Sequence, residues 1–150
     1  MRIAFELIFY IIINLVPGKV DHFQADFKKD DEKVMLEFTR EPNNHWKVLG
    51  QVKGQKRKEA LYFWFDKDLS KYHQKTERRT KTYPFAVRYN IKRNHRKWRK
   101  TSLITYTMKS SSTKFLSFKI SKQSKHRYHV APAEGDAELK DFPEFWVYWK

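Results

Sequence analysis

Hydrophobic and polar residues alternate with a period of two along most of the chain after residue 20. Apolar side chains at every second position, separated by charged or amide side chains, are typical of β-strands that bury one face. The alternating segments are residues 23–27, 34–38, 46–52, 85–91, 104–108, 116–120, 128–130 and 145–149. The pattern predicts a mainly β protein, a single antiparallel β-sandwich or barrel-like domain of about seven or eight strands.

Two further segments differ from this pattern. Residues 61–65, which read Leu-Tyr-Phe-Trp-Phe, are apolar at every position. A run of this kind predicts a central strand covered on both faces. Residues 66–81 show no clear period, and we expect a loop there with one or two helical turns, capped by Asp68 or Ser70.

The chain begins with an apolar run at residues 3–16 that follows one positive charge and ends at Pro17-Gly18. This arrangement is typical of a secretory signal peptide, although Glu6 interrupts the run and no small residues mark a cleavage site. We therefore expect a signal or targeting segment at residues 1–18 and one basic β-rich domain at residues 19–150. The alternatives are a buried helix or strand of the domain itself, and a short membrane span; a retained helix would make the fold α+β.

Positive charge is concentrated in the middle of the chain. The formal net charge is +15. Residues 45–130 hold 24 Lys and Arg against four Asp and Glu, whereas residues 1–44 and 131–150 are both slightly acidic. Such a field attracts anionic partners. The alternative is a solvated basic surface that only keeps the protein soluble.

The densest cationic stretch is residues 92–100, which read Lys-Arg-Asn-His-Arg-Lys-Trp-Arg-Lys. Cationic side chains release counterions from a polyanion when they bind it, and an unpaired base can stack on an exposed indole. The flanking alternating segments place this stretch in a hairpin-like connection or on the strand ends beside it. The alternative is that Trp98 turns into the core while its cationic neighbours reach into solvent. The predicted polyanion-binding residues are Lys92, Arg93, Arg96, Lys97, Trp98, Arg99 and Lys100.

Two other basic clusters extend the predicted binding surface. They comprise Lys53, Lys56, Arg57 and Lys58 in one segment, and Lys71, Lys75, Arg78, Arg79 and Lys81 in another. The predicted contact residues among them are Lys56, Arg57, Lys58, Arg78 and Arg79. Loops that carry these residues would form a groove if they lay on the same face as residues 92–100. If the loops lie on opposite sides, the charges surround the molecule and no groove forms.

Several catalytic and metal-binding chemistries find no support in the sequence. The chain has no cysteine, which excludes disulfides, thiolate zinc sites and cysteine nucleophiles. It has no His-Glu-x-x-His motif and no glycine-rich phosphate loop, so we predict no metal and no cofactor. The histidines leave open a ribonuclease that works by general acid–base catalysis. The candidates for that role are His45, His73, His95, His126 and His129.

The leading hypothesis is a non-enzymatic, exported binding module for a polyanion: RNA, DNA, a sulfated glycan or anionic lipid headgroups. One alternative is a protein-interaction or assembly subunit that meets an acidic protein surface or docks its aromatic residues 142–149 on a neighbour. The other is the ribonuclease. Residues 1–18 predict secretion or membrane targeting, with membrane contact through residues 3–16. Without such targeting, the protein would be intracellular or organellar.

Overall fold

The computed structural model describes residues 5–29, 31–85, 87–93, 101–108, 114–133 and 142–150. Eleven antiparallel strands form one sheet, in the order β6-β5-β4-β3-β2-β1-β11-β10-β9-β8-β7. The elements are α1 (Phe5–Leu15), β1 (His22–Lys29), β2 (Glu32–Glu41), a 3-10 turn η1 (Pro42–Asn44), β3 (His45–Val52), β4 (Glu59–Phe65), β5 (Lys71–Lys75), β6 (Thr80–Pro84), β7 (Val87–Arg93), β8 (Thr101–Met108), β9 (Lys114–Ser124), β10 (Arg127–Pro132) and β11 (Glu144–Tyr148). The predicted mainly β, antiparallel fold is confirmed, with more strands than the seven or eight expected.

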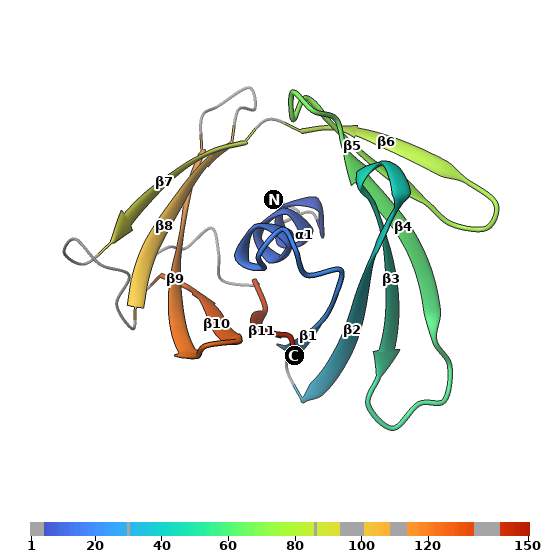
Figure 1. Ribbon diagram of the computed structural model, residues 1–150, viewed down its shortest axis with the longest axis horizontal. Helices are drawn as coiled ribbons and strands as arrows, with labels where there is room; N and C mark the ends of the chain where they lie inside the picture. Colours follow the sequence, from blue (N-terminus) through green and yellow to red (C-terminus); the bar gives the residue numbers. More distant parts are fainter. Residues whose placement is uncertain (1–4, 30, 86, 94–100, 109–113, 134–141) are drawn as a thin grey trace.

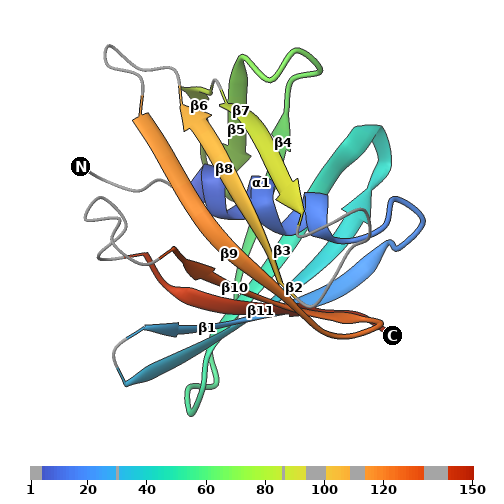
Figure 2. The ribbon, with the colours of Figure 1, turned by 90° about the vertical axis from the view of Figure 1, so that its left-hand side faces the viewer.

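The sheet curves around α1. Figure 1 shows the helix in the hollow of the sheet, with β2–β6 on one side and β7–β10 on the other. The view turned by 90° agrees, because α1 again lies between these two halves (Figure 2). β6 and β7 form the two edges of the sheet; they are consecutive in the chain and do not pair with each other, so the described strands do not close into a barrel.

The helix ends where the sequence stops supporting it. Its last helical residue is Leu15, and Pro17 follows two residues later. Proline disfavours the helical conformation in the residue before it and cannot donate a backbone hydrogen bond. The Pro17 carbonyl then accepts a hydrogen bond from the Val20 amide at 3.0 Å, which turns the chain toward β1.

Aromatic side chains connect α1 to both halves of the sheet. Phe9 stacks on Phe63 of β4 with ring centroids 4.6 Å apart and meets Phe38 of β2 edge-on at 5.8 Å. Tyr10 contacts Phe65 of β4 at 5.6 Å and Tyr106 of β8 at 6.3 Å. The helix therefore covers the inner face of the sheet, as the second sheet does in a β-sandwich.

Period-two alternation correctly identified the inner face of the sheet. In β1 the predicted apolar positions Phe23, Ala25 and Phe27 are all buried, and Phe38 in β2 is fully buried. The predicted alternation of residues 145–149 also holds, because the side chains that face inward in and after β11 are Phe145, Val147 and Trp149. These three side chains pack within the chain's own core, and docking of residues 142–149 on a neighbour stays a prediction.

The expectation of a helical loop at residues 66–81 is wrong. This segment contains strand β5 and the start of strand β6, with a turn before each. In the first turn, Asp68 Oδ1 accepts hydrogen bonds from the Ser70 amide and hydroxyl at 3.0 and 2.7 Å. The alternation of apolar and polar residues is weak in these two strands because both are short. Tyr72 and Tyr83 are their main inward-facing residues, and the side chains on the outer face are polar.

The expectation that residues 61–65 are covered on both faces is wrong as well. Phe63 is fully buried against α1, but Tyr62 on the opposite face is 36% exposed. Within the part of the chain that the structure describes, no second layer covers this outer face. Instead, Trp64 lies between two histidine rings, His45 of β3 and His73 of β5.

Residues 5–15 of the predicted targeting segment form α1, whose side chains Leu7, Ile11 and Ile12 are at most 1% exposed. The structure therefore contains the core helix that the sequence left open as an alternative. No helix in the described part of the chain is long and apolar enough to cross a membrane. A targeting or processing role for residues 1–18 stays a prediction.

Candidate anion-binding surface

The predicted basic block is described only at its first two residues. Lys92 and Arg93 lie at the end of β7, and β8 begins at Thr101. β7 and β8 pair along their whole length, so the block connects two paired strands, as expected. Residues 94–100, which include Arg96, Lys97, Trp98, Arg99 and Lys100, lie outside the described residues.

The predicted contact residues of the other two clusters lie on the opposite side of the molecule. Residues 56–58 form part of the exposed loop between β3 and β4, where Arg57 is 3.7 Å from Glu59. Arg78 and Arg79 are exposed in the turn between β5 and β6. Figure 1 shows both loops on its right side and the end of β7 on its left side. The structure therefore does not bring these clusters together with Arg93 in one groove.

A cation-lined concavity of about 410 Å³ opens on the outer face of the sheet. Lys28 and Lys33 lie directly opposite each other in the pairing of β1 with β2. Lys53 follows β3, and its amide donates to the Lys33 carbonyl at 2.9 Å. Arg127 approaches from β10. We call this site the central concavity; its lining residues are Asp26, Phe27, Lys28, Lys33, Val34, Met35, Lys53, Arg127 and Trp146.

The lysines of the central concavity have acidic neighbours, since Lys28 lies opposite Glu144 of β11 and two residues from Asp26. Lys28, Lys33 and Lys53 form no ion pair with any carboxylate in the described part of the chain. Like charges directly opposite each other on paired strands destabilise a sheet. A bound anion would remove this repulsion, so the arrangement favours anion binding.

An ordered tryptophan forms one wall of the central concavity. Trp146 of β11 stacks on the ring of His129 in β10, with centroids 4.8 Å apart and planes 25° apart. His129 Nε2 is 2.6 Å from Glu144 Oε1, which holds the imidazole in place. The indole is therefore fixed in position before any ligand arrives.

The carboxylate of Asp26 lies beside Trp146 in the concavity. Its Oδ1 accepts a hydrogen bond from Gln24 at 3.2 Å and its Oδ2 accepts one from the Tyr148 hydroxyl at 3.1 Å. Burial, with the nearby Asp26 charge as a second cause, raises the pKa of Tyr148 to about 12. The Tyr148 hydroxyl therefore keeps its proton, which it donates to Asp26.

This pKa shift predicts a loss of stability at alkaline pH. The unfolded chain releases the Tyr148 proton near pH 10, whereas the folded chain keeps it to about pH 12. Stability therefore falls as pH rises through this window. Urea unfolding between pH 10 and 12 should show a shallower decline for Tyr148→Phe than for the unmodified protein. Tyr62→Phe, at an exposed position on β4, is the control and should keep the original decline; equal declines in all three proteins would contradict the assignment.

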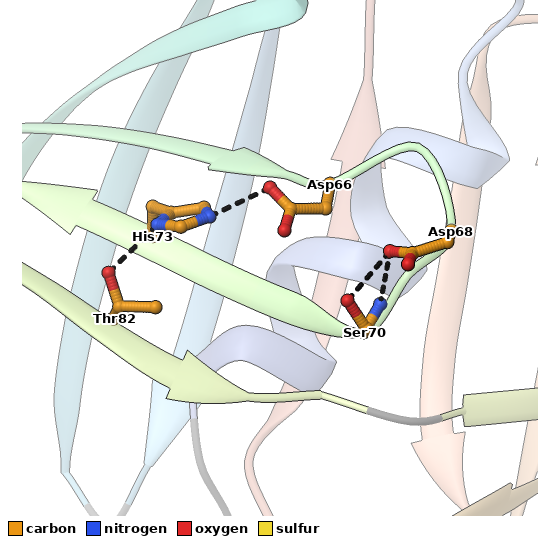
Figure 3. A network of polar contacts seen from close by, with 5 residues as sticks. All are labelled: Asp66, Asp68, Ser70, His73 and Thr82. Atoms are coloured by element: carbon orange, nitrogen blue, oxygen red, sulfur yellow. Dashed lines mark hydrogen bonds and ion pairs between the residues drawn. The ribbon is translucent and has the colours of Figure 1, made fainter.

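A second histidine–tryptophan stack lies on β4 and β5. His73 stacks on Trp64 with centroids 5.0 Å apart, and its Nε2 is 2.8 Å from Asp66 Oδ1. Its Nδ1 is 2.9 Å from Thr82 Oγ1. Figure 3 shows His73 between these two partners. In both stacks, the histidine faces a tryptophan on the neighbouring strand and contacts a carboxylate two residues from that tryptophan.

These contacts bear on the ribonuclease alternative. Both ring nitrogens of His73 already have partners, and the only nitrogen of His129 with a described partner contacts Glu144. His45 is stacked on Trp64, and His126 lies against Trp149 on another part of the sheet. Among the described residues, no group of three His, Asp or Glu side chains is placed to hold a metal ion. The ribonuclease alternative stays a prediction.

Of the residues that line the central concavity, sequence reasoning placed only Lys53 in a predicted basic cluster. Lys28 and Lys33 flank a charged turn between two alternating segments, so their pairing was accessible from the sequence. Trp146 and Arg127 come from β11 and β10, and no local signal shows that β11 pairs with β1 and β10 with β11.

Comparisons of the chain with models of known protein families, with curated proteins and with solved structures gave no match.

Proposed function

We propose that this protein is a non-enzymatic binding module for a polyanion. The observation that carries the proposal is the central concavity, where Lys28, Lys33 and Lys53 meet without an ion pair among the described residues. The high positive charge of residues 45–130 supports it. The basic block at residues 92–100 provides a second contact region for a ligand long enough to reach it.

Counterion release explains why a polyanion suits this surface. Each Lys or Arg that neutralises a phosphate or sulfate displaces condensed cations from the ligand, and the entropy gained depends on the salt concentration. A small monovalent anion carries no such condensed layer. Affinity for a polyanion should therefore exceed affinity for inorganic phosphate and should fall as salt rises.

The experiment measures affinity for a labelled oligonucleotide and for heparin over a range of salt concentrations. Replacing Lys28, Lys33 and Lys53 together by Gln should reduce the slope of log Kobs against log salt by about 2–3, because each lost contact removes about one unit. The matched control replaces Lys19, Lys67 and Lys71 by Gln; it removes the same charge from exposed positions outside the concavity and should change the slope little.

Absent or salt-independent binding to both ligands would overturn the proposal. Equal slope changes in the two triple variants would mean that the charge acts as a diffuse field and that the concavity is not a contact site. Circular dichroism of each variant checks that the sheet is retained.

A further inference from the structure

The central concavity contains more than positive charge. A purely electrostatic site needs only cations, whereas this one places Trp146 and the Asp26 carboxylate among them. Indole faces stack on aromatic rings, and carboxylate oxygens accept hydrogen bonds from N–H groups. The site can therefore stack an aromatic ring on Trp146, accept hydrogen bonds from the ring edge at Asp26 and attract negative charge to its cationic side chains.

The strand register places cations on both sides of the indole. Trp146 is paired with Asp26, while Lys28 is paired with Glu144, two residues away toward one end of the strands. Arg127 is paired with Tyr148, two residues away toward the other end. Two residues along a strand span about 7 Å. The order cation, aromatic ring, cation along this direction matches a base between the phosphates on its two sides.

Asp26 argues against a ligand that is anionic throughout. A carboxylate repels sulfate and phosphate groups but accepts hydrogen bonds from the N–H and amino groups at a base edge. Each of its oxygens has one described donor, and a carboxylate oxygen has a second lone pair to offer. The volume of about 410 Å³ is in the range of small-ligand sites.

We propose that the polyanion is single-stranded nucleic acid, with one unpaired base stacked on Trp146 and its flanking phosphates near Lys28, Lys33 and Lys53 on one side and Arg127 on the other. This inference rests on the proposed function. His129 and Glu144 act as positioning residues, because they hold the indole. A duplex would fit poorly, since its bases already stack on each other.

The test compares three probes on the full chain: a short single-stranded oligonucleotide, an abasic oligonucleotide of the same length, and heparin. Fluorescence anisotropy should show tighter binding of the base-containing strand than of the abasic strand, by about tenfold. Trp146→Ala should weaken binding of the base-containing strand by about fivefold to a hundredfold. The same variant should bind the abasic strand and heparin as the unmodified protein does.

Two further variants separate stacking from folding. Trp146→Phe keeps an aromatic face and should recover part of the lost affinity. Trp64→Ala is the matched control, because Trp64 is also stacked on a histidine of the outer face but lies outside the concavity. It should leave binding of all three probes unchanged.

Each outcome decides between the two proposals. Binding of the abasic strand or heparin as tightly as the base-containing strand would overturn the single-strand inference and leave polyanion binding intact, and so would an unchanged affinity of Trp146→Ala. Failure to bind any probe would overturn both. If Trp146→Ala does not fold, the comparison of probes on the unmodified protein and on Trp146→Phe still decides.

Discussion

Truncation of Phe9 to alanine should lower the free energy of unfolding by about 3–5 kcal/mol. Phe9 is 4% exposed and stacks on Phe63 while its edge meets Phe38. Losing the ring leaves a cavity between α1 and two strands, and strands held in a sheet cannot collapse to fill it. Because domains are stable by about 5–15 kcal/mol, this one change removes a large part of the total.

Urea unfolding followed by circular dichroism measures this effect. The control is Asn14→Ala on the same helix: Asn14 is exposed, and its side chain donates to the Tyr10 carbonyl at 2.7 Å. It should change stability by less than about 0.5 kcal/mol. Phe9→Ala with the stability of the unmodified protein would show that α1 does not pack in the hollow of the sheet in solution.

A related deletion extends the test to the whole helix. A chain that begins at residue 16 lacks every contact between α1 and the sheet, including those of Tyr10 with Phe65 and Tyr106. We expect no cooperative unfolding transition from this chain. A cooperative transition would show that the sheet is stable without α1, as a removable targeting segment requires.

Replacing Arg93, Arg96, Lys97 and Arg99 together by Gln should weaken polyanion binding by about a hundredfold at about 0.15 M salt. This factor follows from the loss of four contacts, because each contact releases about 0.7 counterion when a single strand binds. Salt titrations with a labelled oligonucleotide measure both the affinity and the slope. The slope should become smaller, because fewer counterions are released.

The matched control replaces Lys56, Arg57, Arg78 and Arg79 by Gln. It removes the same number of charges from the other side of the molecule (Figure 1), and a localised site predicts a much smaller loss for it. Equal losses would show that the total charge and not the position of residues 92–100 determines binding.

The fold class was readable from local pattern because strands that bury one face must place apolar side chains at every second position. Phe23, Ala25 and Phe27 illustrate this, since their burial follows from their spacing alone. The same rule failed for β5 and β6. In these two strands the outward-facing residues are polar and only a few residues face inward. Tyr72 and Tyr83 were therefore not recognised as part of the inner face.

The candidate site was predictable only in part. Lys28 and Lys33 are brought together by one turn, so a local rule places them opposite each other. The alternation of residues 142–149 was visible in the sequence. The sequence did not show that Trp146 would face outward beside Asp26, which is 120 residues earlier in the chain. The distribution of charge along the sequence also did not show that residues 56–58 and Arg93 lie on opposite sides of the molecule.

The sequence by itself determined the strands other than β5 and β6, the concentration of positive charge and the absence of cysteine chemistry, because each depends on residue identity or on neighbours a few positions apart. The tertiary structure decided that α1 fills the hollow of the sheet and that the central concavity joins β1, β2, β3, β10 and β11. Both depend on the pairing of β1 with β11. That pairing joins segments about 120 residues apart through backbone hydrogen bonds, which any residue except proline can donate and which therefore leave little trace in the sequence.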